Sequence, residues 1–301
     1  MRNVFLWIYS FHMPLFIFVS GYFAKSAINK ERFKVEKICS YFLLYGLLKF
    51  LVFSVHKYIL NSSTITFNFW STSDIPWYLL AMIIWLCITN CIKDIKPRYV
   101  LIISLILSCI IGCDKNVRDY LALSRVIVFY PFFLSGYYIN KDNITKIVNS
   151  KKIKIFSLAM VSLSIIAIVL FSEELYSLRP FFTGRNPYEL INTPINGVFY
   201  RIVAIIISTC MCISLLSLTP RKKTIYSAFG SRTLQIYFLH APLLPLYNKF
   251  LKPFMLTNFP NRWKIICILI GIVVTIVLSL KIFEYPFKKI MSIRFSDRVF
   301  K

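Results

Sequence analysis

Residues 11–23 read FHMPLFIFVSGYF, a stretch in which a histidine, a proline and a Ser-Gly pair interrupt an otherwise apolar run. The run is long enough to enter a lipid bilayer. His12, Pro14 and the Ser20-Gly21 pair are each costly or destabilising in hydrocarbon, because they add a polar group or weaken the helix. The stretch therefore predicts a membrane helix with a local cavity beside it.

The composition of the whole chain supports a membrane location. Hydrophobic residues make up 57% of the 301 residues, and the mean hydropathy is +0.66. Apolar runs of roughly 16 to 22 residues recur along the chain, and about 20 residues cross a bilayer as a helix. These features predict an all-α fold, a polytopic transmembrane helical bundle, and exclude a soluble protein.

The apolar runs predict nine membrane spans. We expect them at about residues 4–24, 38–60, 75–92, 98–113, 124–140, 153–172, 198–218, 233–251 and 264–284. The sequence shows no internal repeat and no soluble domain, so residues 1–301 are expected to form a single integral membrane domain. The longest outer loop, at about 173–197, is long enough to act as a lid.

Lysine and arginine are concentrated in alternate loops, at residues 25–37, 93–98, 141–154, 221–232 and 288–301. Residues 61–74, in an intervening loop, contain neither. By the positive-inside rule this pattern predicts an outer N-terminus and a cytoplasmic C-terminus. The same loops carry most of the net charge of +24, which we ascribe to helix orientation and anionic membrane lipid rather than to nucleic acid.

The cysteines do not form a recognisable metal or disulfide pattern. Cys87 and Cys91, like Cys109 and Cys113, are spaced i, i+4, but no histidine or carboxylate cluster accompanies them. We interpret the cysteines as small packing residues and predict no metal site. His56 lies near the outer end of a predicted span, where a histidine is ordinary, and is interpreted as structural.

The other two histidines lie inside predicted spans, each just before a proline. Pro14 removes a backbone donor after His12 and would free a carbonyl one turn earlier, which opens the helix toward water or ligand. A kinked helix whose histidine bonds a neighbouring backbone is the alternative interpretation. His240 precedes Pro242 and shares a helix face with Tyr237; it is compatible with a buried structural histidine or with a functional one.

Two arginines and two aromatic residues complete the set of candidate functional residues. Arg125 opens the fifth predicted span, and Arg185 lies in the long outer loop. A guanidinium keeps its proton and offers five donors, so it suits a phosphate, a thioester oxyanion or a sugar; an interfacial anchor is the alternative for Arg125. Trp77 and Tyr78 fit either an aromatic belt or a platform on which a sugar stacks.

The quoted stretch FHMPLFIFVSGYF resembles the hallmark of the acyltransferase 3 superfamily, in particular its fucose 4-O-acetylase-like branch of integral membrane acyltransferases. Four more segments resemble parts of that family in the same order: PWYLLAM at 76–82, RVIVFYPFFLSGYYI at 125–139, LQIYFLHAPL at 234–243 and FEYPFKK at 283–289. Together the five segments extend over most of the chain.

The resemblance implies a membrane enzyme that transfers an acyl group, usually acetyl, from cytoplasmic acyl-CoA to a hydroxyl of a bacterial surface polysaccharide or its lipid-linked precursor. Acetyl-CoA is the expected donor, and no permanently bound cofactor is expected. Such a transfer needs a base and oxyanion donors, roles that we assign to His12 and Arg125. An acyl-histidine relay is a variant. The residues expected to bind substrate are Trp77, Tyr78, Arg185, Tyr237 and His240.

The chain departs from the family pattern at its beginning. Family members usually have ten helices, the first of which ends in a histidine, and this sequence starts at what would be their second. Nine spans with an outer N-terminus are what remains when the first helix is removed from ten spans with both ends in the cytoplasm. The expected location is a bacterial inner membrane. Two other classes of protein are also compatible with the sequence: a transporter of lipid-linked glycan or small solute, and a non-catalytic membrane partner of a polysaccharide synthesis complex.

Overall fold

The computed structural model describes residues 2–28, 33–62, 66–71, 75–117, 119–193, 195–220, 222 and 225–293. Within these ranges the chain is mainly helical and contains no strand beyond an isolated bridge between Ile28 and Phe33. The predicted all-α fold is therefore confirmed. Some basic residues that orient the predicted spans lie outside the described ranges, at positions 30, 32, 221, 223, 294, 298 and 301.

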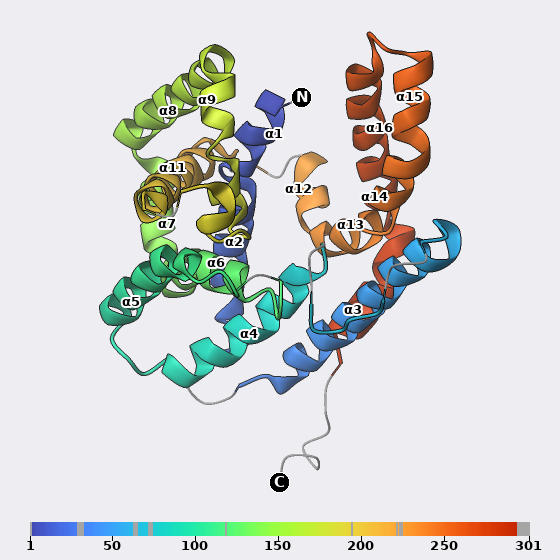
Figure 1. Cartoon of the computed structure of the whole chain (residues 1–301). Coiled ribbons are helices and arrows are strands. Elements are labelled where there is room, and N and C mark those ends of the chain that lie inside the picture. The colour runs from blue at the N-terminus through green and yellow to red at the C-terminus, as the bar shows by residue number, and fades with distance from the viewer. Residues whose placement is uncertain are drawn as a thin grey trace. The chain divides into compact units, whose positions relative to one another are not determined.

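The chain divides into two compact units, which are described separately (Figure 1). The first comprises Met1–Phe33 and Ile84–Pro220, and the second comprises Lys34–Ile83 and Arg221–Lys301. Helix α4 (Trp77–Ile92) begins in the second unit and ends in the first. The other helices of the first unit are α1 (Arg2–Tyr9), α2 (His12–Ala24), α5 (Pro97–Ile110), η2 (Ile111–Cys113), α6 (Leu123–Tyr138), α7 (Lys141–Asn149), α8 (Lys151–Leu170), α9 (Ser172–Tyr176), α10 (Arg179–Thr183), η3 (Glu189–Ile191) and α11 (Gly197–Leu218).

The second unit is built from two groups of helices that are far apart in the sequence. One group precedes α4 and the other forms the C-terminal part of the chain. Contacts between α3 and α17 join the two groups. The helices of this unit are α3 (Val35–Ser54), η1 (Val55–Ile59), α12 (Ile225–Gly230), α13 (Thr233–His240), α14 (Leu243–Leu246), η4 (Tyr247–Leu251), α15 (Lys252–Asn258), α16 (Trp263–Leu278), η5 (Lys281–Phe283) and α17 (Glu284–Met291).

Four helical segments within the described residues are long and apolar enough to cross a membrane: Asn3–Ala24, Val35–Ile59, Lys151–Leu170 and Gly197–Leu218. A pair bent by 58°, Trp263–Leu278 with Lys281–Met291, would make a fifth. Every predicted span coincides with helical structure, but the remaining ones are shorter helices or, at 233–251, a run of short helices. The number nine therefore stays a prediction.

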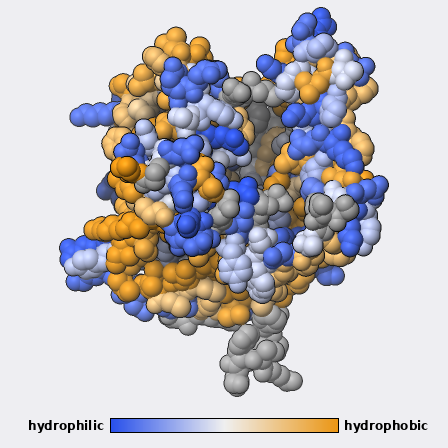
Figure 2. Space-filling view, viewed as in Figure 1, coloured by the Kyte–Doolittle hydropathy of each residue, from blue (hydrophilic) through white to orange (hydrophobic). Residues whose placement is uncertain are grey.

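Apolar side chains cover much of the outer surface. On α5, Ile102 and Ile106 are more than half exposed, and on α8 so are Leu158 and Leu163. Figure 2 shows the hydrophobic surface over the position of α5 in Figure 1. Soluble proteins rarely expose such continuous apolar faces. The surface thus has the chemistry of a protein that meets lipid, which agrees with the predicted membrane location.

The tightest helix contact in the first unit is the crossing of α2 and α6, and it depends on two glycines. A Cβ on Gly21 would clash with the backbone of Phe133, and a Cβ on Gly136 would clash with the backbone of Phe18. Each glycine thus lets the partner helix approach to backbone contact, as small residues do between membrane helices. The Ser20-Gly21 pair therefore lies in a closely packed crossing rather than beside the expected cavity.

Polar contacts fix the same region from both sides. Lys25 follows α2 and donates from Nζ to the Ile139 carbonyl at the C-terminal end of α6, where a cation is favourable. Burial lowers the pKa of Lys25. Near the start of α6, Trp85 of α4 donates from Nε1 to the Val126 carbonyl at 2.9 Å. The Lys25 contact thus joins the end of α2 to the end of α6, and the Trp85 contact joins α4 to α6.

We predict that Gly21→Ala and Gly136→Ala each destabilise the protein by about 1–3 kcal/mol, because the added methyl group overpacks a backbone contact. The matched control is Gly271→Ala in α16, where no atom lies within 4 Å of the added Cβ. Thermal unfolding in detergent would measure the effect. Equal melting temperatures for the three variants would contradict the role of the crossing.

Candidate active site

His12 lies at a break between two helices of the first unit. Helix α1 ends at Tyr9, and α2 begins at His12. Because Pro14 has no N–H, the carbonyl of Ser10 lacks its usual helical donor; it accepts instead from Oγ of Ser208 in α11, at 2.7 Å. The helix break and the freed carbonyl expected around Pro14 are present, but this carbonyl bonds Ser208 instead of facing water or ligand.

The His12 ring is held by the helix before it, α1. Its Nδ1 lies 2.9 Å from the Ile8 carbonyl oxygen. A carbonyl oxygen can only accept, so Nδ1 carries the proton and the neutral ring keeps its lone pair on Nε2. The ring also packs edge-on against Tyr9, at 4.6 Å between centroids. The backbone contact expected for a merely kinked helix is present at Nδ1, yet Nε2 retains the chemistry of a base.

Arg125 and Arg185 meet at one carboxylate, Asp119. Arg125 is buried near the start of α6, and its Nη2 lies 3.4 Å from Oδ1 of Asp119. Arg185 approaches in a bidentate manner, with Nε 2.8 Å from Oδ1 and Nη2 2.6 Å from Oδ2. Such a fork is among the stronger charged contacts in proteins. Asp119 was not among the candidate residues predicted from the sequence; the signal that could have identified it is its place just before a span that opens with arginine.

The histidine and the arginines belong to the same end of the first unit. Arg125 and Arg179 both lie within electrostatic range of the Tyr9 hydroxyl, and Tyr9 packs on His12. His12 thus packs on Tyr9, the charge of Arg125 acts on the Tyr9 hydroxyl, and Asp119 joins Arg125 to Arg185. A base and guanidinium donors in one region form the pattern that acyl transfer requires.

The loop between α8 and α11, which the sequence predicts to be an outer loop, is anchored rather than loose. The Gly184 carbonyl accepts from Ser124 Oγ at 2.8 Å. The backbone φ of Gly184 is +64°, a conformation that glycine adopts without strain. Tyr188 fills a slot against Gly112 and Gly197, where any Cβ would strike its ring. Its hydroxyl donates to the Cys109 carbonyl at 2.6 Å, and burial raises its pKa. The loop that carries Arg185 is therefore held in place.

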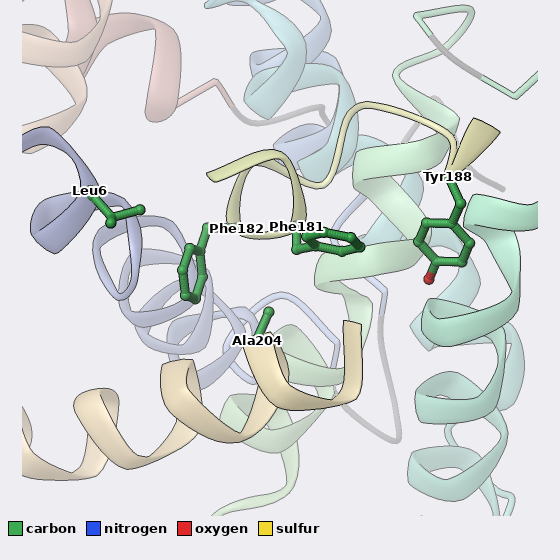
Figure 3. Packing of buried hydrophobic residues seen from close by; sticks show 5 residues of the cluster. All are labelled: Leu6, Phe181, Phe182, Tyr188 and Ala204. Carbon is green, nitrogen blue, oxygen red and sulfur yellow. The ribbon is translucent and has the colours of Figure 1, made fainter. Parts of the chain in front are cut away.

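A buried arginine that sequence reasoning missed supports this loop. Arg201 of α11 is 1% exposed, donates from Nη1 to the Phe181 carbonyl, and lies over the rings of Phe181 and Tyr188. Figure 3 shows these two rings with Phe182, Leu6 and Ala204 in the surrounding apolar cluster. No carboxylate pairs with Arg201 in the part of the chain that the structure describes. The sequence feature that could have identified Arg201 is the presence of an arginine inside an apolar predicted span.

We predict that Tyr188→Ala releases the outer loop, because the slot is emptied and the bond to Cys109 is lost. Trypsin should then cleave after Arg185 several times faster than in the wild type, while the control Tyr285→Ala, which alters an exposed tyrosine, should cleave at the wild-type rate. Limited proteolysis followed by mass spectrometry gives both rates. An unchanged rate in Tyr188→Ala would show that the anchor is unimportant.

The remaining predicted residues cluster in the second unit. The Tyr237 ring lies 5.4 Å from Tyr78 and 6.0 Å from His240, and Tyr78 lies 6.4 Å from Trp77, all between centroids. Tyr237 donates its hydroxyl proton to the Ile75 carbonyl. His240 has its Nδ1 3.0 Å from the carbonyl oxygen four residues earlier, which repeats the arrangement of His12. These four aromatic side chains thus lie together in the second unit, whereas His12, Arg125 and Arg185 belong to the first.

Metal ligands show no comparable clustering. Among the described residues there is no group of three or more histidine, cysteine, aspartate or glutamate side chains that could hold a metal ion. The eight cysteines are free thiols.

The helical fold and apolar surface define the class of this molecule, an integral membrane protein with several spanning helices. A family model described as an acyltransferase domain matches residues 2–281. The chain belongs to this acyltransferase 3 family, which confirms the resemblance to the superfamily; four of the five segments lie within the matched residues, and the segment at 283–289 follows them. No curated protein and no solved structure matches the chain.

Proposed function

We propose that this acyltransferase transfers an acyl group, most simply acetyl, from acyl-CoA to a hydroxyl of a cell-surface polysaccharide or its lipid-linked precursor. The observation that carries the proposal is the His12 ring, whose Nδ1–H is fixed on the Ile8 carbonyl so that Nε2 holds a lone pair at a helix break. The family match supports the acyltransferase class. The choice of acetyl-CoA as the donor and of a glycan as the acceptor is part of the proposal and goes beyond the family match.

In the proposed reaction, Nε2 of His12 removes the proton of the acceptor hydroxyl as its oxygen attacks the thioester carbonyl. A carbon–oxygen bond forms, and the carbonyl electrons move to its oxygen to give a tetrahedral oxyanion. When this intermediate collapses, the carbon–sulfur bond breaks and the CoA thiolate leaves. The thiolate takes up the proton held by the His12 imidazolium, so that ester and free CoA are formed and His12 returns to its neutral state.

Arg125 is the proposed donor to the oxyanion. Its side chain is buried, and a buried guanidinium acts in a low-dielectric surrounding where it stabilises developing negative charge more than it would in water. Asp119 holds Arg125 and Arg185 by the contacts described above. We infer that Asp119 keeps the two arginines in place before substrate binds, and that Arg185 contacts the acceptor.

The aromatic cluster of Trp77, Tyr78, Tyr237 and His240 is the proposed contact for a sugar ring. Faces of tryptophan and tyrosine pack well on the apolar faces of sugars and present a polar edge to the hydroxyls. The cluster is preorganised, since Tyr237 is bonded to the Ile75 carbonyl. The distribution of lysine and arginine supports an outer N-terminus, with acyl-CoA entering from the cytoplasm of a bacterial cell.

We predict that His12→Ala lowers acyl transfer at least about 100-fold, the range usual for loss of a general base, while the amount of protein in the membrane stays near normal. The assay is transfer of label from acetyl-CoA to a surface polysaccharide fraction in membrane vesicles. His56→Ala, which alters a half-buried histidine in η1, is the control and should retain activity. Wild-type transfer by His12→Ala would refute the assignment.

We predict that Arg125→Lys lowers the turnover number about 100-fold or more, because an ammonium group cannot reproduce the planar fork that faces the oxyanion. The same vesicle assay, run at several acetyl-CoA concentrations, separates turnover from binding. Arg262→Lys, at an exposed arginine before α16, is the matched control. If Arg125→Lys keeps its turnover number, Arg125 is an interfacial anchor and the oxyanion donor lies elsewhere.

A further inference from the structure

The first unit contains an apolar cavity that acyl transfer does not account for. Its volume is about 210 Å³, and its walls come from α1, α8, α9, α10 and α11 and from Leu178. Leu6 lines it from α1, Ser10 from the turn after α1, Ala167 from α8, Phe182 from α10 and Met211 from α11. Figure 3 shows Leu6 and Phe182 as neighbours in this region.

The few polar groups in the cavity wall are already hydrogen-bonded. Ser10 donates from Oγ to the Trp7 carbonyl at 2.7 Å. Ser164 donates to the Val161 carbonyl at 2.7 Å and accepts from Trp7 Nε1 at 3.0 Å. A water molecule would find few partners here, and apolar cavities of about 150 Å³ are known to stay dry and to take up hydrocarbon guests. The wall chemistry therefore favours a hydrocarbon occupant.

The membrane supplies such an occupant directly. Helix α8 is a candidate membrane span, and Leu163, which lines the cavity, is 61% exposed on its surface. One wall of the cavity is thus also part of the surface that meets lipid. A lipid chain could enter sideways from the bilayer without crossing a polar barrier.

An arginine without a carboxylate partner lies next to the cavity. Arg179 follows the lining residue Leu178 and precedes Phe182 by one helical turn. Its guanidinium lies over the rings of Phe5 and Tyr176, at 5.1 and 5.7 Å from their centroids. It is exposed, and in the described part of the chain no carboxylate pairs with it. A guanidinium in this position suits a phosphate group.

We infer that this cavity binds one acyl chain of an anionic membrane glycerophospholipid, with the lipid phosphate at Arg179. Leu6 of α1 and Ser10, just after α1, line the cavity, whereas Phe5 and Tyr9 lie on another face of α1, on which the His12 ring packs. The lipid chain therefore packs between α1, α8 and α11 on a different face of α1 from the one that His12 contacts. It is a structural lipid rather than the acyl donor, and the inference does not depend on the proposed reaction.

Photolabelling of the purified full-length protein tests the inference. The probe is phosphatidylglycerol with a diazirine in one acyl chain, reconstituted at low abundance in nanodiscs and mapped by mass spectrometry. We expect label on the lining segments of α8 and α11, and at least a five-fold loss of that label in Ala167→Phe, which fills the cavity. The control Ile166→Phe changes an exposed neighbour that does not line the cavity and should label as the wild type does.

The opposite results are equally clear. Label in Ala167→Phe equal to that of the wild type, or spread evenly over α5, α8 and α16, would show ordinary surrounding lipid and overturn the inference. If Ala167→Phe is not recovered as a monodisperse protein, Leu175→Trp fills the cavity from α9 and is judged by the same criterion. Because the readout is labelling and not activity, failure of the proposed reaction would leave this test unaffected.

The head-group contact is tested with the same probe. Arg179→Gln should lower cavity labelling by phosphatidylglycerol at least three-fold relative to a diazirine-labelled neutral diacylglycerol, since the charge that attracts the phosphate is lost. Equal labelling ratios in Arg179→Gln and the wild type would remove Arg179 from the site and contradict the anionic head group.

Discussion

The reciprocal glycine contact between α2 and α6 is the constraint on which the rest of the first unit depends. Backbone meets backbone at Gly21 and Gly136, and Lys25 closes the same end on the Ile139 carbonyl. The two helices therefore run in the same direction. Their first turns carry His12 and Arg125, which at 1.5 Å per residue lie about 13 and about 16 Å along each helix from the glycines. The packing at the glycine end thus determines where His12 and Arg125 lie at the other end of the helix pair.

The opposite end of this helix pair is closed by arginines and a loop. Arg125 and Arg185 meet at Asp119, and Arg201 and Tyr188 hold the loop that carries Arg185. Among the described residues, Asp119 pairs with Arg125 and Arg185, and no carboxylate pairs with Arg201. The region therefore carries more positive than negative charge. Such an excess is costly inside a protein. The proposed thioester oxyanion would compensate this positive charge during the reaction.

The sequence predicted the helical class, the family and the helix break, because these depend on local composition and spacing. Apolar runs of membrane length and the His-Met-Pro segment are visible without any knowledge of partners. It did not predict that Gly21 packs on Phe133, that Asp119 joins two arginines, or that Arg201 supports the outer loop. Each of these depends on residues far apart in the chain, and no local pattern shows which ones meet. The predicted cavity beside the Ser20-Gly21 pair was wrong for the same reason, because the contact between Gly21 and Phe133 is not visible in the local sequence.

The proton NMR spectrum of the host's surface polysaccharide tests the central claim most directly, by comparing the parent strain, a strain lacking the gene, and that strain complemented with this chain. The account predicts that O-acyl signals disappear on deletion and return on complementation, with other sugar signals unchanged. Identical O-acyl signals in the deletion strain and its parent would contradict the assignment of this protein as a surface-glycan O-acyltransferase.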